Sequence, residues 1–376
     1  MQLIPETLNI WSILLILYLV ITLIQVFYYW FFFARLGFYK ARKSSGSRKA
    51  VSVVIAAKNE YLNLKKNLPL ILEQDYPEYE VLVVNDASDD ETSSLLEELE
   101  KKYQHLKTIK LYQNLNFFRG KKFPLSIGIR SAKNEIILLT DADCRPASNA
   151  WIKAMAGNFN KATDVVLAYG PYEKKKSLLN RIIRFDTFHI GVQYLSFALA
   201  GLPYMGVGRN LAYRKELFIR QKGFTSHYKV SSGDDDLFVN KVAHRHNTRI
   251  EIRPKAHTLS TTKSTLAAWL RQKQRHLSTG KFYRSKFKWL LGLYAFSQLF
   301  FYVLFFLLIS LGYAWIIVLA AFALRLCTQM IVLKKCSNRL NEKDLFVFSP
   351  LFELIIILLN LISAGRNLFV KQHKWK

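Results

Sequence analysis

The sequence predicts a doubly wound α/β domain with a mostly parallel sheet, joined to membrane-crossing helices on both sides. Three observations lead to this prediction. Apolar segments alternate with helical patterns from Val51 onward, acidic residues follow two of the predicted strands, and long apolar runs stand near both ends of the chain. Alternating strands and helices are typical of parallel sheets, which bind ligands at the carboxyl ends of their strands.

Composition narrows the class of partner. The chain has 376 residues, with 54 Lys and Arg against 27 Asp and Glu, for a net charge of +27. Such an excess indicates an anionic partner. With 51% hydrophobic and 14% aromatic residues, the chain is too apolar for a nucleic-acid-binding tail, so we expect a membrane and no nucleic acid. Its three cysteines form no C-x-x-C pair, which favours a reduced compartment for the α/β domain.

Residues 1–34 are predicted to form an N-terminal transmembrane helix. The run from about Leu8 to Phe33 is almost uninterruptedly apolar, and about 20 such residues span a bilayer. It is too long for a signal peptide, and no Lys or Arg precedes it. A basic linker follows over 35–50, and the positive-inside rule places that linker in the cytoplasm.

The α/β domain is expected over 51–288. Its first half contains apolar segments that are typical of buried strands, at 51–57, 81–84, 108–112 and 136–139. Helices are predicted between them, at about 62–72, 92–102 and 119–131. This alternation predicts a parallel sheet with right-handed crossovers.

Two acidic pairs follow strands of this sheet. Asp141 and Asp143 come directly after the fourth strand, and Asp86 and Asp90 come after the second. Alternating carboxylates repel each other unless a cation lies near both, and Mg²⁺ is held by one or two carboxylates plus substrate phosphates. A solvated acidic turn is the alternative, since D-x-D is common. Both pairs are expected at the same sheet edge, in one crevice.

The second half of the domain is less regular. Lys174–Lys176 precede a basic amphipathic helix at about 178–190, which either lies on the membrane surface or packs internally. The glycine-rich loop 201–208 suits a close approach of backbone to ligand. A third acidic cluster, 234–236, stands before a helix at about 238–244. Helix capping explains one of its carboxylates and leaves two.

A basic helix segment completes the candidate site. Arg271, Gln272, Arg275 and His276 place hydrogen-bond donors close together on one helix, enough to bind an anion. A solvated helix face is the alternative.

The C-terminal part is apolar again. Residues 289–333 contain two runs that are each long enough to cross a bilayer. A third apolar segment, 345–364, contains Pro350 and Glu353. If this segment crossed the membrane once, the basic residues near the C-terminus would lie outside the cell, against the positive-inside rule. A re-entrant or interfacial segment would avoid this conflict. We expect a multi-pass protein of the cell (inner or plasma) membrane, with residues 51–288 in the cytoplasm.

The ordered motifs over about 51–280 resemble the inverting family 2 glycosyltransferases, which have a Rossmann-like GT-A fold. The likeness is greatest to membrane-embedded members such as ceramide glucosyltransferase and the processive polysaccharide synthases. Residues 52–60 resemble the opening strand of the family, and 86–90 resemble its turn that contacts the nucleobase and ribose. The resemblance therefore implies donor-binding roles for Asn59, Glu60, Asp86 and Asp90.

The remaining motifs supply the implied chemistry. Asp141-Ala142-Asp143 matches the D-x-D motif that binds the donor diphosphate through Mg²⁺ or Mn²⁺. Residues 233–237 resemble the E-D segment that carries the base, which alignment on Leu237 places at Asp234, with Asp235 still open. Residues 272–276 are similar to Q-x-x-R-W, with His276 in place of Trp, a departure from the processive synthases.

The activity implied is a hexosyltransferase. A sugar would pass with inversion from a nucleotide-sugar donor to a hydroxyl of a lipid, lipid-linked or growing glycan acceptor. Asp234 would be the general base. Lys121, Gln272, Arg275 and His276 would contact the donor, and Lys121, Arg275 and His276 would add positive charge near its phosphates. Two alternatives are a non-enzymatic basic membrane-surface binding protein and a metal-dependent nucleotidyltransferase. The latter should carry a glycine-rich loop after its first strand, where residues 57–60 contain no Gly.

Overall fold

The computed structural model describes residues 9–41, 49–112, 120–228, 230 and 232–369. Its centre is a seven-stranded sheet of order β3-β2-β1-β4-β7-β6-β8. The first four strands in the sequence are β1 (Val51–Ala57), β2 (Tyr79–Asp86), β3 (Leu106–Leu111) and β4 (Ile136–Leu139). These four run parallel, as the sequence predicts. The mostly parallel α/β fold is therefore confirmed.

The other half of the sheet is mixed, which was not predicted. Strand β7 (Leu211–Arg214) lies antiparallel to both β4 and β6 (Val165–Ala168), and β8 (Thr248–Glu251) runs parallel to β6. A separate two-stranded sheet pairs β5 (Arg145–Pro146) with β9 (Thr258–Leu259). This small sheet connects the segment after the D-x-D motif to the segment before the basic helix, so both lie at one edge.

Hydrophobic side chains on both faces of the sheet form its core. On β1, Val53 and Ile55 pack in one cluster with Leu64 and Leu68, whereas Val54 packs in the other. Burial on both faces explains why the strands are continuously apolar. The covering helices are α3 (Tyr61–Leu72), α4 (Thr92–Lys102), α5 (Lys122–Ser131) and α6 (Trp151–Ala156).

Helix α7 (Leu178–Leu199) connects the sheet to the apolar helices. Of its two interpretations, the structure supports the internal one: Arg184 is 2% exposed and pairs with Glu342 and Asp344 beyond α12. The remaining helices of the α/β part are α8 (Lys215–Arg220), α9 (Asp236–Val242) and α10 (Leu266–Leu277). They are accompanied by short 3₁₀ turns, of which η2 (Gly208–Asn210) contributes to the site.

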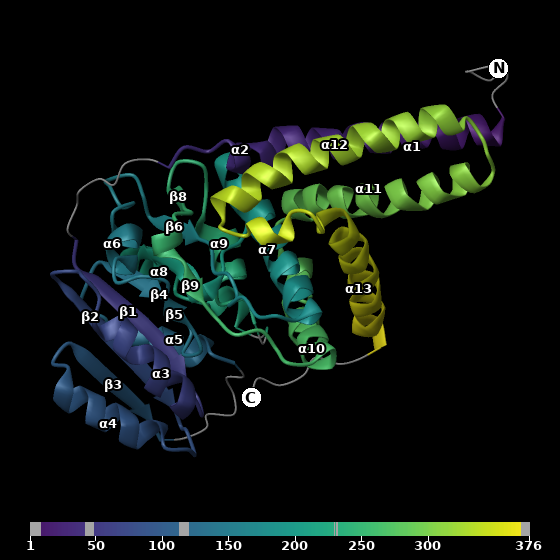
Figure 1. Ribbon diagram of the computed structural model, residues 1–376. Coiled ribbons are helices and arrows are strands. Elements are labelled where there is room, and N and C mark those ends of the chain that lie inside the picture. The colour runs from purple at the N-terminus through teal and green to yellow at the C-terminus, as the bar shows by residue number, and fades with distance from the viewer. Residues whose placement is uncertain (1–8, 42–48, 113–119, 229, 231, 370–376) are drawn as a thin grey trace.

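Within the residues that the structure describes, three helices are long and apolar enough to cross a membrane: 10–37, Ser285–Ser310 (α11) and Trp315–Arg339 (α12). The first comprises α1 (Ile10–Phe27), the π-helical stretch η1 (Tyr28–Phe33) and α2 (Ala34–Gly37). Helices α1, α11 and α12 lie side by side, and α13 (Ser349–Phe369) runs across their direction (Figure 1). The predicted linker 35–50 falls partly on 42–48, which lie outside the described residues.

Candidate active site

A lysine joins two of the three predicted acidic clusters. Lys121 stands directly before α5, and its Nζ lies 2.7 Å from Asp141 Oδ1 and 3.2 Å from Asp234 Oδ2. Asp141 follows β4, and Asp234 lies in the loop before α9. Residues far apart in the sequence thus meet at the carboxyl ends of β1 and β4, where open α/β sheets bind ligands.

The charges of this group depend on one another. Burial alone would lower the pKa of the Lys121 amine, but Asp141, Asp234 and Asp235 hold it well above its usual range. Burial also opposes ionisation of Asp141, yet Lys121 lowers the pKa of that carboxyl overall. Burial raises the pKa of Asp234, with Lys121 acting against the rise. The lysine therefore stays protonated and stabilises ionised carboxylates on both sides.

The three adjacent aspartates have different surroundings. Asp235 is the N-cap of α9, since its Oδ1 accepts a hydrogen bond from Asp236 N at 2.8 Å, and its Oδ2 accepts one from Gly208 N at 2.6 Å. Asp236 accepts hydrogen bonds from Tyr283 at 2.8 Å and from Thr279. Burial, followed by the charge of Asp235, raises the pKa of Asp236 to about 7.

Asp234 lines the cavity together with Asp235 and Asp236, and Lys121 holds it in place. Its side chain is 6% exposed, and its Oδ2 lies 3.2 Å from Lys121 Nζ, while no other group that the structure describes donates a hydrogen bond to this oxygen. A carboxylate oxygen that contacts one cation can still accept a further hydrogen bond. Asp234 is therefore the aspartate of this cluster that can accept a proton from a ligand without losing a helix cap.

Gly208 allows this close grouping. A Cβ atom on Gly208 would lie 3.2 Å from Asp235 Oδ2 and 3.3 Å from Lys121 Nζ. The predicted glycine-rich loop thus brings backbone against the charged groups, and a larger residue would push them apart.

The D-x-D segment fits a divalent cation. Side-chain donor atoms of Asp141, Asp143 and Cys144 all lie within 4.8 Å of one another. Asp143 is also held by Ser260, whose Oγ lies 3.3 Å from its Oδ2. Carboxylate oxygens suit hard cations such as Mg²⁺ and Mn²⁺, whereas the thiol is a softer donor.

Helix α10 supplies the basic side of the site. Gln272 donates to the Tyr172 hydroxyl at 3.3 Å, and Arg275 Nε is buried without a hydrogen-bond partner among the described residues. Desolvation by the surrounding protein atoms, followed by the charges of Arg275, Arg209 and Lys121, lowers the pKa of His276 to about 3, although its side chain is exposed to the cavity. A bound diphosphate would oppose this shift, so the positive charge of His276 near the donor stays a prediction.

Sequence reasoning missed Arg209. Its guanidinium donates to the Gly170 carbonyl at 2.8 Å through Nε and lies 4.9 Å from the ring centre of Tyr172. Arg209 directly follows Gly208, and this position after the glycine-rich loop was the available signal.

One cavity of about 760 Å³ contains most of the predicted site. Of the predicted residues, it is lined by Glu60, Lys121, Asp141, Asp143, Asp234, Asp235, Gln272, Arg275 and His276. Asn59, Asp86 and Asp90 lie near the same sheet edge but outside this lining. Asn59 Oδ1 accepts a hydrogen bond from Asp89 N at 2.8 Å, and Asp90 accepts from Tyr61 N at 3.2 Å, so both connect the turns after β1 and β2.

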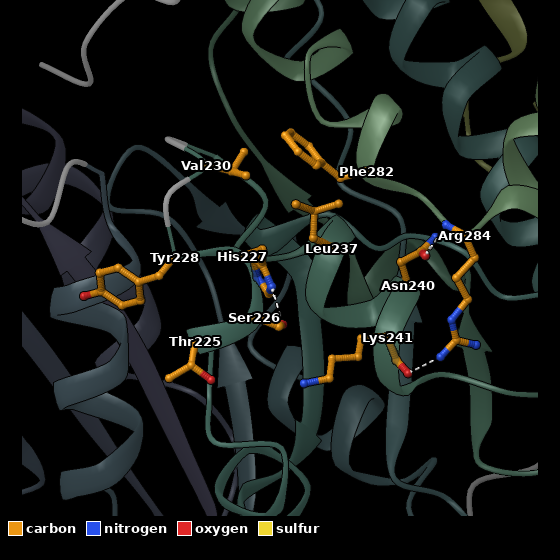
Figure 2. Close-up of a pocket in the computed structure, with 10 residues that line it drawn as sticks. All are labelled: Thr225, Ser226, His227, Tyr228, Val230, Leu237, Asn240, Lys241, Phe282 and Arg284. Carbon is orange, nitrogen blue, oxygen red and sulfur yellow. Dashed lines mark hydrogen bonds between the residues drawn. The ribbon is translucent and has the colours of Figure 1, made fainter.

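A smaller pocket of about 520 Å³ adjoins α9, and none of the described residues that line it carries a carboxylate (Figure 2). Leu237 and Asn240 of α9 line it, together with Phe282 and Arg284 from the segment before α11. Its other wall is the loop around His227, whose carbonyl accepts a hydrogen bond from Lys122 Nζ at 2.7 Å. Among its described lining residues, this pocket therefore lacks the carboxylates that could hold a metal ion or act as a base in the larger cavity.

Comparisons with known proteins agree with this geometry. The family model described as glycosyl transferase family 2 matches residues 52–221. A probable glycosyltransferase, YdaM, of Bacillus subtilis is 25% identical over 378 residues, covering 89% of this chain and 88% of the relative. The poly-beta-1,6-N-acetyl-D-glucosamine synthase of Staphylococcus epidermidis is 24% identical, covering 62% and 55%.

Two further similarities concern a lipid-modifying enzyme and a solved structure. The beta-monoglucosyldiacylglycerol synthase of Trichormus variabilis is 34% identical over 119 residues, covering 31% of this chain and 25% of that enzyme. The mannosyltransferase PcManGT from Pyrobaculum calidifontis, solved with GDP-Man and Mn²⁺, superposes with a TM-score of 0.60. It is 19% identical and covers 96% of this chain and 99% of its own, so the two share a fold.

Proposed function

Because the chain is a membrane-associated glycosyltransferase of family 2 with a GT-A fold, we propose that it transfers a hexose from a nucleotide-sugar donor to an acceptor hydroxyl, with inversion. The observation that carries the proposal is the convergence of Lys121, Asp141 and Asp234 in one cavity. The names of the relatives indicate a lipid acceptor in one case and a growing glycan in another, so the proposed acceptor hydroxyl belongs to a lipid or a glycan.

The donor is bound by its diphosphate. Cationic side chains from several elements line the cavity around the D-x-D motif, and they include Lys58, Lys121, Arg209, Arg271 and Arg275. Charge-assisted hydrogen bonds to phosphate are about twice as strong as neutral ones. Lys121 Nζ lies between Asp141 and Asp234 and can contact a phosphate placed beside them. Arg275 Nε can donate a hydrogen bond to the same phosphates, because it has no acceptor among the described residues.

Asp141 and Asp143 are the residues that would hold a divalent cation, either Mg²⁺ or Mn²⁺. This assignment is supported by their hard oxygen donors and by the spacing of these atoms. When bound, the cation would stabilise negative charge on the departing nucleoside diphosphate. Ser260 positions Asp143 for this role.

Asp234 is the general base of the proposed reaction. Its Oδ2, which lies 3.2 Å from Lys121 Nζ, takes the proton from the acceptor hydroxyl as the acceptor oxygen attacks the anomeric carbon. The bond from the anomeric carbon to the donor phosphate oxygen breaks on the opposite face, so an α-linked donor yields a β-linked product. Burial of the carboxylate among protein groups excludes competing water from the base.

The proposed topology places residues 51–288 in the cytoplasm, where nucleotide sugars are available. Residues 1–34 and 289–333 provide the crossings, although α11 already begins at Ser285. The segment 345–364 lies in the plane of the membrane, because α13 runs across the direction of α1, α11 and α12 (Figure 1). Its exposed Leu351, Leu358 and Leu361 would face lipid.

The test is to incubate membranes containing the protein with a panel of nucleotide sugars, with Mg²⁺, Mn²⁺ or a chelator. We expect release of nucleoside diphosphate with one donor, and loss of that release on chelation or in Asp143→Asn. The variant Asp75→Asn, at a carboxylate with 71% side-chain exposure, is the matched control. Release of pyrophosphate would indicate a nucleotidyltransferase, and absence of metal-dependent nucleotide binding would indicate a surface-binding protein.

A further inference from the structure

The active-site cavity continues past the carboxylates into the apolar helices. Its lining includes four residues of α11 at helical spacing, Lys288, Leu291, Ala295 and Gln298, together with Tyr294 of the same helix and Ile356 and Asn360 of α13. Residues three and four apart share a helix face, so one face of α11 and one of α13 border the space. The donor-binding part and this extension form one cavity.

The extension reaches only part of the way across a bilayer. From Lys288 to Gln298 the helix rises by about 15 Å, at 1.5 Å per residue. The hydrocarbon core of a bilayer is about 30 Å thick. Among the described residues, none from α1 or α12 lines the cavity. The space therefore enters the membrane from the catalytic side and ends near its middle.

Buried polar side chains close the inner end. Gln298 donates to Glu353, and Arg325 pairs with both carboxylate oxygens of Glu353 at 2.7 Å. Gln25 and Gln329 complete this cluster, the polar plug, by accepting from Arg325 at 3.1 and 2.6 Å. Arg325 and Glu353 are 1% and 2% exposed. A sugar polymer threaded across the membrane would have to break this network.

The extension is bordered by α11 and α13, which both contribute residues to its lining. Ala295 lines it and is exposed, while Leu291 and Asn360 are half-buried. Exposed apolar residues stand beside this space on both helices, including Phe296 and Leu361, which are 64% and 47% exposed. Such residues fit lipid chains, so an opening between α11 and α13 would admit lipid from the leaflet nearest the active site.

Apart from Lys288 at its entrance, the polar groups inside the extension are neutral or already paired. Asp186 and Lys273 lie 2.5 Å apart and form an ion pair. His189 and Gln298 both contact the Tyr294 hydroxyl, at 3.0 and 3.3 Å, and burial lowers the pKa of His189, which keeps it neutral. Asn360 Oδ1 has no hydrogen-bond partner among the described residues. These groups suit hydroxyls better than a phosphate.

We propose that the acceptor is an uncharged membrane lipid with a free hydroxyl, which enters between α11 and α13 and is glycosylated without being threaded across the membrane. This inference rests on the proposed glycosyl transfer. The lipid hydroxyl loses its proton to Asp234, its oxygen forms the bond to the anomeric carbon, and the nucleoside diphosphate leaves. The lipid chains stay in the leaflet while the head group reaches the base.

The test uses the full chain in phosphatidylcholine vesicles that contain diacylglycerol, ceramide, a monoglycosyl lipid or polyprenyl phosphate. We expect transfer to at least one uncharged lipid, with one sugar added per transfer, and at least a 10-fold loss of that transfer in Ala295→Trp, which fills the opening. Leu293→Trp, on the same helix but outside the lining, should behave as the wild type. Asn360→Leu should raise the KM for lipid and leave the KM for donor unchanged.

Donor binding and slow donor hydrolysis, measured without acceptor, separate the two levels of the proposal. Both should be unchanged in Ala295→Trp, because the donor-binding part lies elsewhere in the cavity. Transfer only to polyprenyl phosphate, a long polymer product, or full activity of Ala295→Trp with an uncharged lipid would overturn the acceptor assignment alone. Absence of donor binding and hydrolysis in the wild type would overturn the proposed function with it.

Discussion

Lys121 is the residue through which the acidic clusters meet. It bridges Asp141 and Asp234 and lies close to Gly208, so its charge balances carboxylates that come from two distant loops. Removing it would leave the buried carboxylate of Asp234 without its partner, which would destabilise the site. The site thus holds positive charge between the D-x-D motif and Asp234, the proposed base, before any donor binds.

The three aspartates of the 234–236 cluster should respond differently to Asn. Asp234→Asn removes the base, and we expect turnover to fall about 10²–10⁴-fold with donor affinity and melting temperature nearly unchanged. Asp235→Asn leaves one side-chain oxygen where Gly208 N and Asp236 N now donate to two. The loss of one hydrogen bond should lower the free energy of unfolding by about 0.5–2 kcal/mol, as the loss of a helix N-cap does. Turnover, nucleotide affinity and melting temperature are measured for each variant. A collapse of turnover in Asp235→Asn alone would place the base there instead.

Asp236 should make stability depend on pH. Its folded-state pKa of about 7 lies above the ordinary 3.8, so the native state holds the proton more tightly than the unfolded chain. Stability from this group is therefore fully present below about 4, falls as pH rises toward about 7, and is level above that. The melting temperature of the wild type relative to Asp236→Asn should fall over this window. A difference that stays constant would refute the shift, and Asp75→Asn controls for loss of a carboxylate.

At the scale of elements, the apolar helices are tied together by the polar plug. Arg325 on α12 and Glu353 on α13 are buried, and Gln25 and Gln298 bring in α1 and α11. Removing one member of a buried ion pair lowers stability strongly, because the other charge stays buried without its partner. This network fixes α13, one wall of the cavity extension.

Removing one member of the Arg325–Glu353 pair should lower stability more than removing both members. We expect Arg325→Met and Glu353→Met each to lose about 3–5 kcal/mol of stability, and the double variant to recover much of that loss. Thermal unfolding in detergent or nanodiscs would measure these effects. As a control, Ile331→Met changes an exposed residue of α12, which is 47% exposed, and should have little effect. Additive losses in the double variant would contradict a coupled pair.

At the scale of the whole molecule, the α/β domain and the apolar helices are joined by α7, which packs between the sheet and those helices. Arg184 of α7 pairs with Glu342 and Asp344 in the segment between α12 and α13. Residues of α7 and α10 line the cavity at this junction. The packing of these two helices therefore sets the distance between Asp234 and the apolar helices.

The proposed topology predicts which surfaces a reagent reaches. Cysteine placed at Lys176, exposed on the α/β part, should react with an impermeant thiol reagent only after cells are opened. Cysteine at Leu311, 48% exposed between α11 and α12, should react from outside in intact cells. A protease added outside should leave residues 35–288 uncut. The opposite labelling pattern would reverse the orientation and separate the active site from cytoplasmic nucleotide sugars.

Local patterns were enough to predict the parallel strands, the apolar helices and the acidic motifs at the strand ends. Those features depend on neighbours in the chain: a run such as Ile136–Leu139 must be buried on both faces, and long apolar runs must avoid water. The order β4-β7-β6-β8 could not be predicted, because antiparallel pairing of β7 depends on contacts with residues about 75 positions away.

The tertiary structure alone decided which charges meet and where the cavity leads. Charges on side chains interact according to distance in space, which the sequence does not specify for Lys121 and Asp234, or for Arg325 and Glu353. The same holds for His276, whose pKa is lowered by surrounding protein atoms and by the cations Arg275, Arg209 and Lys121, which come from three separate parts of the chain. Motifs predicted the chemistry, whereas burial and packing determined the protonation of its groups and the direction from which an acceptor reaches them.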